Sequence, residues 1–242
     1  MPKGARPKRT VVCPNPPPRS YLIGGHRYLF KHPSGRTAQQ IWSEVIAYKL
    51  AREVGVDVPP AFLACDSATA EAGVLIEYFY GPPGRRDVRF VHAVDRFQAH
   101  AISFDEKAGA LTNNIAVSRM QGAPDWRGWW ARTLAFDTLI GNTDRHSENW
   151  GFLVDWQAGS RPTYELAPAF DNGSSLGCAI RDEDLIRYHE PDRFKRFLGR
   201  GHHYSWRDRD DTPGGHAALC GNLSGDMAKL PRSWVGSRPY PI

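Results

Sequence analysis

The sequence predicts an α+β protein made of two unlike parts, and three observations support this. Up to about residue 80, short β-prone runs alternate with turn signals around a single helical pattern. Residues 80–84 read YGPPG, which interrupts regular structure. Beyond this break, helical periodicity dominates. We therefore expect a small, mostly antiparallel β-rich domain at 1–80 and a mostly helical domain at 81–242, joined at a hinge.

Composition bounds the class of protein. The 242 residues are 41% hydrophobic and 24% charged, which is enough for one or two packed domains. The net charge of +5 suits a nucleotide or an acidic substrate but is too small to argue for direct nucleic-acid binding. No apolar run is long enough to span a membrane, and the basic start has no apolar core behind it, so no signal peptide is expected. The four cysteines form no CxxC pair, which favours reduced thiols and a cytoplasmic protein.

The first part of the chain begins with residues 1–20, which are rich in Pro, Lys and Arg. This composition is typical of a disordered arm, although residues 9–13 have strand character. Two β-prone runs follow, at 21–23 and 28–31, and a Gly-Gly pair lies between them. Such a pair between β-prone runs predicts a hairpin.

A helix is predicted over residues 37–54, with Gly55 as its C-cap. Glu44 lies in the middle of this helix between Ile41 and Val45, so its side chain points towards the apolar stripe. A carboxylate there is costly without a cationic partner. Two interpretations stay open, a buried ion pair and a residue at the edge of an exposed face.

Strands are predicted at 61–65 and 73–79, and helical patterns occupy much of 89–135. The segment 126–140 is apolar around most of its circumference, which indicates a central buried helix whose tryptophans belong to the core. Asp125 is its expected N-cap.

A second hairpin is predicted from runs at 150–154 and 162–166 around a turn at 157–160. It returns the chain to the end of the central helix. Residues 182–200 are expected to be partly helical, and one more helix is expected near 217–229.

Five polar residues form the skeleton of a phosphoryl-transfer site. Asp144 and Asn149 lie in a polar loop after the central helix, and Asp171 follows the hairpin. Lys31 ends a strand, and Glu44 lies in the next helix. Phosphoryl transfer from ATP needs oxygen ligands for Mg²⁺, a cation on the phosphates and a carboxylate near the acceptor hydroxyl. Each residue alone is a weak signal, but their order along the chain is specific.

The motifs carry a family resemblance. Residues 141–152 (GNTDRHSENWGF) resemble the catalytic loop of HipA-like serine/threonine kinases, and residues 166–171 (LAPAFD) resemble that family's metal-binding segment. The Asp-Arg-His-Xaa-Xaa-Asn core is also similar to that of phosphatidylinositol 3/4-kinases. Residues 4–8 (GARPK) resemble the family's phosphate loop, which favours an ordered nucleotide loop over a disordered arm. The resemblance covers about residues 3–190 and is strongest at 134–173.

The resemblance implies a bilobal protein-kinase-like fold with a small, mostly antiparallel β N-lobe and a mostly helical C-lobe. It implies that Asp144 is the catalytic base or orients the acceptor, and that Asn149 and Asp171 hold Mg²⁺. Lys31 would contact the α- and β-phosphates of ATP, paired with Glu44.

Other implied ATP contacts are less direct. Backbone groups from Glu77 to Phe79 would contact adenine, and Gly4 would belong to the phosphate loop. His146 would lie near the phosphates, with a role in bracing its own loop as the alternative.

The chain departs from the family pattern at three points. Lys3 stands where the family commonly has a serine that is a site of inhibitory autophosphorylation, so that control is not expected here. Asn172 alters the residue after the metal-binding aspartate. The chain is also short, and we expect it to lack the N-terminal subdomain of full-length members.

These expectations define a leading function and its alternatives. The leading one is an ATP- and Mg²⁺-dependent kinase for a protein Ser/Thr hydroxyl, similar to HipA toxins, with an antitoxin encoded nearby as a partner. A kinase for a lipid or small molecule is the alternative enzyme, and a nucleotide-binding interaction module with little turnover is the alternative from another class. A metal-dependent hydrolase is the most distant, with a ligand set of His202, His203, Asp208, Asp210 and Asp211.

Overall fold

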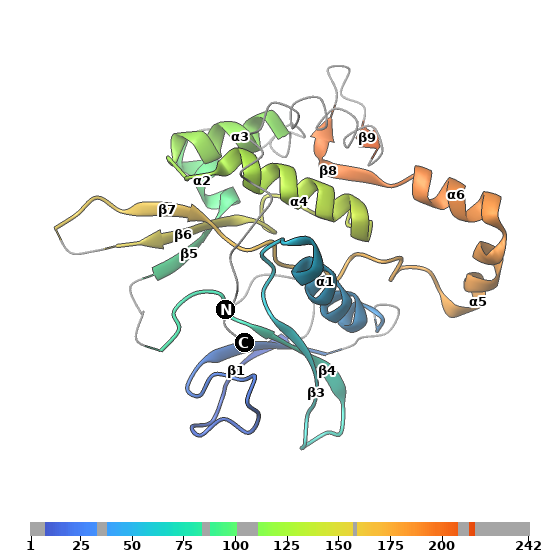
Figure 1. Cartoon of the computed structure of the whole chain (residues 1–242), viewed down its shortest axis with the longest axis horizontal. Helices are drawn as coiled ribbons and strands as arrows, with labels where there is room; N and C mark the ends of the chain where they lie inside the picture. Colours follow the sequence, from blue (N-terminus) through green and yellow to red (C-terminus); the bar gives the residue numbers. More distant parts are fainter. Residues whose placement is uncertain are drawn as a thin grey trace.

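The computed structural model describes residues 8–32, 38–83, 88–100, 111–156, 159–207 and 213–215. Figure 1 shows a β-rich part with one helix and a second part in which helices cover a small sheet. The elements, in chain order, are β1 (Lys8–Val12), β2 (Arg27–Lys31), α1 (Gln40–Val54), β3 (Ala61–Cys65), β4 (Ala72–Glu77), β5 (Val88–His92), α2 (Ala93–Ala99), α3 (Leu111–Met120), α4 (Trp126–Ile140), β6 (Gly151–Asp155), β7 (Thr163–Leu166), α5 (Asp182–Leu185), η2 (Ile186–His189), α6 (Pro191–Gly199), β8 (His202–Arg207) and β9 (Pro213–Gly215).

The first sheet has the strand order β1-β2-β4-β3, and all its pairings are antiparallel. The strand expected at 21–23 is wrong, because β2 pairs instead with β1. The backbone N–H of Leu22 donates to the Arg19 carbonyl at 3.1 Å, and that of Ile23 donates to the Tyr28 hydroxyl at 2.9 Å. The backbone of this segment is therefore used in turns rather than in a ladder.

Helix α1 packs on this sheet and ends at Gly55, as predicted. Gly55 has φ 70°, the left-handed conformation that favours glycine at a helix end. Ala47 and Ala51 of α1 form one buried cluster with Phe136 and Ile140 of α4. This cluster joins the two parts of the molecule directly beneath the polar loop that follows α4.

The second sheet, β5-β6-β7, contains a strand that the sequence reading missed. The helical pattern expected from residue 89 onward is wrong at its start, because Val88–His92 is β5 and pairs antiparallel with β6. An alternation of apolar and polar residues over only five positions is a weak sequence signal for a strand. In addition, β5 forms by pairing with β6, which lies far along the chain. At Gly151 a Cβ atom would lie 2.3 Å from the Val91 carbonyl oxygen, so only glycine allows the two strands to approach.

The predicted central helix is confirmed as α4, which contributes Trp130 and Leu134 to the largest buried cluster. Asp125 occupies the predicted N-cap position of α4, but its side chain does not cap the helix. Asp125 has φ 52° and makes no capping hydrogen bond, because its carboxylate pairs with Arg132 at 2.8 Å instead.

The predicted second hairpin is confirmed as β6 and β7. The division of the chain after residue 80 stays a prediction, and the connection between β4 and β5 spans it. The helix expected at 217–229 lies outside the described residues. Among the described helices, none combines the length and apolarity needed to cross a membrane.

We predict that Trp150→Ala lowers the free energy of unfolding by about 3–5 kcal/mol. Trp150 is fully buried, and its ring packs edge-on against Trp130 at 4.8 Å and Phe97 at 6.1 Å. Truncation therefore leaves a cavity between α4, α2 and β6. Urea denaturation checks the change, with Trp42→Ala as the control because Trp42 is 52% exposed. Equal losses for the two variants would contradict this packing.

Candidate functional site

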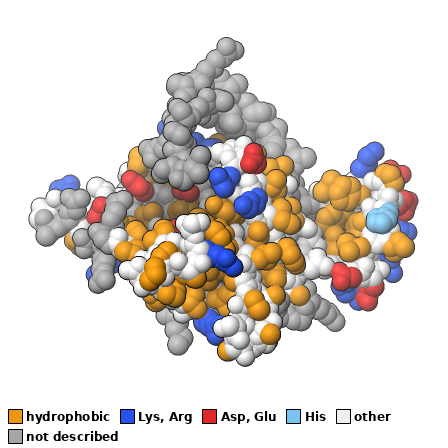
Figure 2. All heavy atoms as spheres, turned by 60° about the horizontal axis from the view of Figure 1, so that its bottom comes forward, with side chains coloured by type: hydrophobic (Ala, Val, Ile, Leu, Met, Phe, Trp, Pro, Cys, Tyr) orange, Lys and Arg blue, Asp and Glu red, His pale blue; other side chains and the backbone are white. Residues whose placement is uncertain are grey.

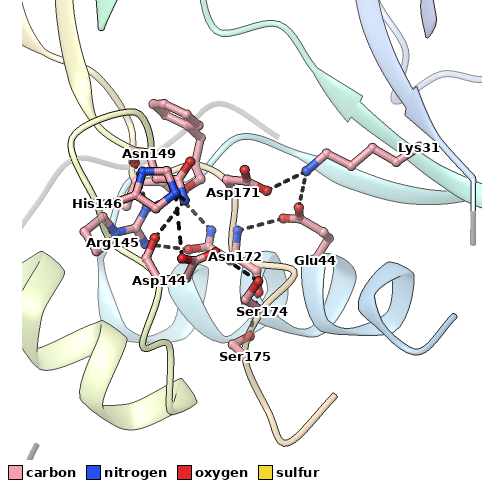
Figure 3. A network of polar contacts seen from close by, with 12 residues as sticks. Lys31, Glu44, Asp144, Arg145, His146, Asn149, Asp171, Asn172, Ser174 and Ser175 are labelled. Carbon is pink, nitrogen blue, oxygen red and sulfur yellow. Dashed lines mark hydrogen bonds and ion pairs between the residues drawn. The ribbon is translucent and has the colours of Figure 1, made fainter. Parts of the chain in front are cut away.

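Lys31 at the end of β2 bridges two carboxylates from different parts of the chain (Figure 3). Its Nζ donates to Glu44 Oε1 at 2.7 Å and to Asp171 Oδ1 at 2.8 Å. Burial alone would lower the pKa of Lys31, but the charges of Glu44 and Asp171 outweigh it and raise the pKa above its ordinary value. Lys31 therefore stays a cation, and Glu44 is a buried ion-pair partner rather than the edge of an exposed face.

The polar loop after α4 carries Asp144 and Asn149 close together. The backbone N–H of Asp144 donates to Asn142 Oδ1 at 3.0 Å, and its carbonyl accepts from Asn149 Nδ2 at 2.7 Å. The Asn149 amide nitrogen is therefore occupied within the loop, and its Oδ1 has no hydrogen-bond partner among the described residues. The loop is closed on itself by these bonds, as a rigid catalytic loop requires.

His146 lies inside this loop. Its Nε2 is 3.2 Å from Asn149 Nδ2 and 3.7 Å from Asp144 Oδ1, while its Nδ1 is 3.2 Å from the backbone nitrogen of Glu148. These contacts brace the loop. Its predicted place near the phosphates stays a prediction.

Arg145 is the residue in this loop that the sequence reading did not single out. It is fully buried, and its guanidinium donates to both carboxylate oxygens of Asp137, at 3.0 and 2.7 Å. It also donates to the carbonyls of Asn149 and Phe170 and to Asn172 Oδ1. Burial alone would lower the pKa of Arg145, but the Asp137 charge reverses this and the pKa is raised. One cation thus fastens the loop after α4 to the segment around Asp171.

The sequence carried a signal for this pair. Asp137 is the one acidic residue of α4 and lies in its mostly apolar last part, Leu134–Ile140, where a buried carboxylate needs a cationic partner.

The segment after Asp171 contributes two more residues that were missed. Asn172 is fully buried, and its backbone N–H donates to Glu44 Oε2 at 3.2 Å. Ser174 Oγ donates to Asp144 Oδ2 at 3.3 Å. Asp171 itself has φ 58°, a left-handed conformation that aspartate tolerates better than most residues. This bend turns the chain so that its next residues reach both Glu44 and Asp144.

The hinge lies beside this cluster. The backbone N–H of Glu77 donates to the Pro60 carbonyl at 2.8 Å, and that of Tyr78 to the Arg27 carbonyl at 3.1 Å. The backbone of Phe79 makes no hydrogen bond to a described residue. Its ring stacks on Phe170 at 5.3 Å, next to Asp171.

A hollow lies next to the hinge, and Phe79 is one of its lining residues. It is formed by the hinge and by the face of β6 and β7 that carries Leu153, and its lining residues are Phe79, Tyr80, Pro82, Val88, Leu153, Asp155, Thr163 and Glu165. Glu77 does not line it, and its side chain accepts from the Tyr28 hydroxyl at 3.3 Å. Burial raises the pKa of Glu77 above its ordinary value.

The residues present fit a magnesium ion bound together with phosphates. Mg²⁺ prefers hard oxygen ligands and is usually held by one or two protein groups plus substrate phosphates. Asn149 Oδ1 and the Asp171 carboxylate supply such oxygens. In the part of the chain that the structure describes, no group of three or more His, Cys, Asp or Glu side chains could hold a metal. Gly4 and the aspartates at 208, 210 and 211 lie outside the described residues.

We predict that Asp137→Ala lowers the free energy of unfolding by about 3–5 kcal/mol, because it leaves the buried Arg145 charge uncompensated. Chemical denaturation measures the loss. The matched control is Asp125→Ala, which removes an exposed partner of Arg132 and is expected to cost no more than about 1 kcal/mol. If Asp137→Ala proved as mild as the control, Arg145 would not depend on this pair.

Comparisons with known proteins identify the family and the fold of this chain. The HipA-like C-terminal domain family matches residues 2–218. The serine/threonine-protein kinase CtkA of Helicobacter pylori (strain J99) is 55% identical over 40 residues, which are 16% of this chain and 11% of that protein. This match therefore covers about a tenth of the curated relative's length.

Two solved structures share the fold. The crystal structure of the Helicobacter pylori proinflammatory kinase CtkA has a TM-score of 0.63 at 20% identity, over 79% of this chain and 67% of that one. A chain of the HipA, HipB and operator DNA complex of Shewanella oneidensis MR-1 has a TM-score of 0.53 at 15% identity, over 96% of this chain and 53% of that one. The expected bilobal kinase-like fold is thus confirmed, and the chain belongs to the HipA-like C-terminal domain family.

Proposed function

We propose that this chain transfers the terminal phosphoryl group of ATP to a Ser or Thr hydroxyl of a protein, with Mg²⁺ as cofactor. The observation that carries the proposal is the bridge of Lys31 to Glu44 and Asp171, with Asp144 held next to it by Ser174 and Asn142. The curated relative is itself a serine/threonine-protein kinase. A cation, two oxygen ligands and a carboxylate thus meet in one place, as phosphoryl transfer needs.

Each residue has a role in the proposed reaction. Lys31 donates to the phosphates and orients them, while Glu44 keeps its ammonium group in place. Asp144 accepts the proton of the acceptor hydroxyl as the hydroxyl oxygen bonds to the γ-phosphorus and the bond from that phosphorus to the departing ADP oxygen breaks. Mg²⁺, when bound by Asn149 and Asp171, supplies positive charge that offsets the charge developing on the phosphates.

The adenine site follows from the hinge. Adenine presents hydrogen-bonding edges that suit a free backbone N–H and C=O, and within the predicted contact segment Glu77–Phe79 it is Phe79 whose N–H and C=O both lack a described hydrogen-bond partner. The backbone N–H of Glu77 is already bonded to Pro60, and Glu77 belongs to β4. We therefore propose Phe79, rather than Glu77, as the residue that contacts adenine. Gly4 remains a proposed part of the phosphate loop.

Partner and compartment are proposals of the same kind. One solved relative comes from a complex of HipA, HipB and operator DNA, so we propose an antitoxin partner for this chain. Three of the four cysteines, Cys13, Cys65 and Cys178, are free thiols, which favours the cytoplasm.

The first prediction concerns the base. Asp144→Asn is expected to reduce phosphate incorporation about 10²–10⁴-fold, because the amide cannot accept the hydroxyl proton. Transfer of radiolabel from γ-labelled ATP to myelin basic protein, chosen as a generic acceptor, measures the change. Asp125→Asn is the control, since it alters an aspartate outside the site. Incorporation by Asp144→Asn at the wild-type level would sink this assignment, and zero incorporation by the wild type with intact ATP binding would favour an interaction module.

A second prediction concerns the metal. Asp171→Ala is expected to abolish the Mg²⁺-dependent part of nucleotide binding, because a ligand oxygen is lost. Isothermal titration with ATP, at several Mg²⁺ concentrations and in EDTA, measures this dependence. Asp125→Ala should keep the wild-type response. An unchanged response to Mg²⁺ in Asp171→Ala would remove Asp171 from the metal site.

A further inference from the structure

The segment 182–200, called the arm here, leaves the body of the protein as the short helices α5, η2 and α6. Figure 1 shows it at the right, apart from both sheets. None of its residues is buried. The described attachments at its base include the bond from Gln39 Nε2 to Asp182 Oδ1 at 2.6 Å. Helices this short gain little stability alone and usually rely on packing, so the arm is built like half of an interface.

The arm exposes large apolar side chains. Leu185, Ile186, Phe194 and Leu198 are 43%, 74%, 47% and 56% exposed. In Figure 2 the arm is the part at the right, where hydrophobic atoms lie beside charged ones. Apolar side chains gathered on one projecting element mark a surface that a partner covers.

Arginines surround a hollow on this arm. The aromatic rings of Tyr188 and Phe197 pack at 5.2 Å within it. The full lining is Arg187, Tyr188, Arg193, Arg196, Phe197 and Arg200. No acidic side chain lines the hollow, and Arg196 forms no ion pair with a described residue. Guanidinium groups around an aromatic floor bind carboxylates well.

The charge of the hollow favours some binding partners of the arm over others. The charged residues that line the hollow are all arginines, so two copies that met hollow to hollow would repel each other. The chain's own residues 216–242 contain three basic residues and one acidic residue, which does not complement the hollow. Nucleic acid fits poorly, because the exposed apolar side chains of the arm would face phosphates.

We propose that the arm is a docking surface for an acidic peptide segment of a partner protein that also carries apolar side chains. Carboxylates of the segment pair with the arginines of the hollow, and its apolar side chains cover Phe194 and Leu198. The arm follows Ser174, which contacts Asp144, so a docked segment is tethered to the catalytic site by a short length of chain. The statement that this partner is the substrate rests on the proposed function.

The test uses the full chain and a fluorescein-labelled peptide of sequence EDEFEDLE, followed by fluorescence anisotropy. Arg196→Glu is expected to weaken binding about tenfold, since it reverses one charge of the hollow. Phe194→Ala is expected to weaken it several-fold. The matched control is Arg19→Glu, an exposed arginine in the connection between β1 and β2, which should bind like the wild type. Both arm positions are exposed, so these variants are expected to fold normally.

Binding that is the same for wild type and Arg196→Glu would overturn the proposal. So would tighter binding of a 20-base-pair DNA duplex or of phosphatidylserine vesicles than of the peptide. Because the measurement needs no phosphoryl transfer, it separates the two hypotheses. A chain that binds the peptide through Arg196 but transfers no phosphate keeps the docking surface and loses the kinase, whereas an active kinase with no peptide binding loses the docking surface alone.

Discussion

Arg145 places a full positive charge where no water reaches it, and the surrounding structure is arranged to match that charge. Asp137, on the last turn of the central helix, accepts two of its hydrogen bonds, and the carbonyls of Asn149 and Phe170 and the amide of Asn172 take others. A buried ion pair adds little net stability relative to apolar packing. The contribution of this ion pair is geometric, because the Arg145 guanidinium sets the distance between the loop after α4 and the segment around Asp171.

A second network carries this arrangement to the other part of the molecule. Helix α1 contributes Glu44, which holds both Lys31 and the backbone of Asn172, and Ser43, whose hydroxyl donates to the Ser175 carbonyl at 3.0 Å. The position of α1 therefore bears on the segment whose Ser174 contacts Asp144. Apolar packing of α1 on α4 supports the same relation from below. Movement of α1 would disturb Lys31 and Asp144 together, the residues that we propose as the phosphate-binding cation and the base.

Lys31 and Asp171 neutralise each other at 2.8 Å. Their proposed ligands carry the opposite charges, phosphates for Lys31 and Mg²⁺ for Asp171. On the proposed function, binding of a metal–nucleotide complex would replace this one ion pair with two. The hinge is separate from this exchange and contributes shape through Phe79 and the face of the second sheet.

The sequence by itself determined the residue types of the site and their order. A lysine at a strand end, a glutamate on an apolar helix stripe and the Asp-Xaa4-Asn loop before a hairpin can be read without a fold, since their chemistry and spacing are local. The resemblance of residues 141–152 to a family motif added the bilobal expectation, which the structure confirms. Helix α4 and the β6–β7 hairpin were also readable, because their periodicity extends over enough residues.

Only the tertiary structure decided the rest. Strand β5 exists because β6 pairs with it. Tyr21–Ile23 forms turns because its backbone N–H groups donate to the Arg19 carbonyl and the Tyr28 hydroxyl. The roles of Arg145, Asn172 and Ser174 depend on partners far along the chain, so no local pattern could assign them. The arm likewise looked like ordinary charged helix, and only the structure shows that none of its residues is buried, which motivates the proposed partner. Sequence states which groups are available, whereas burial and distance decide which of them meet.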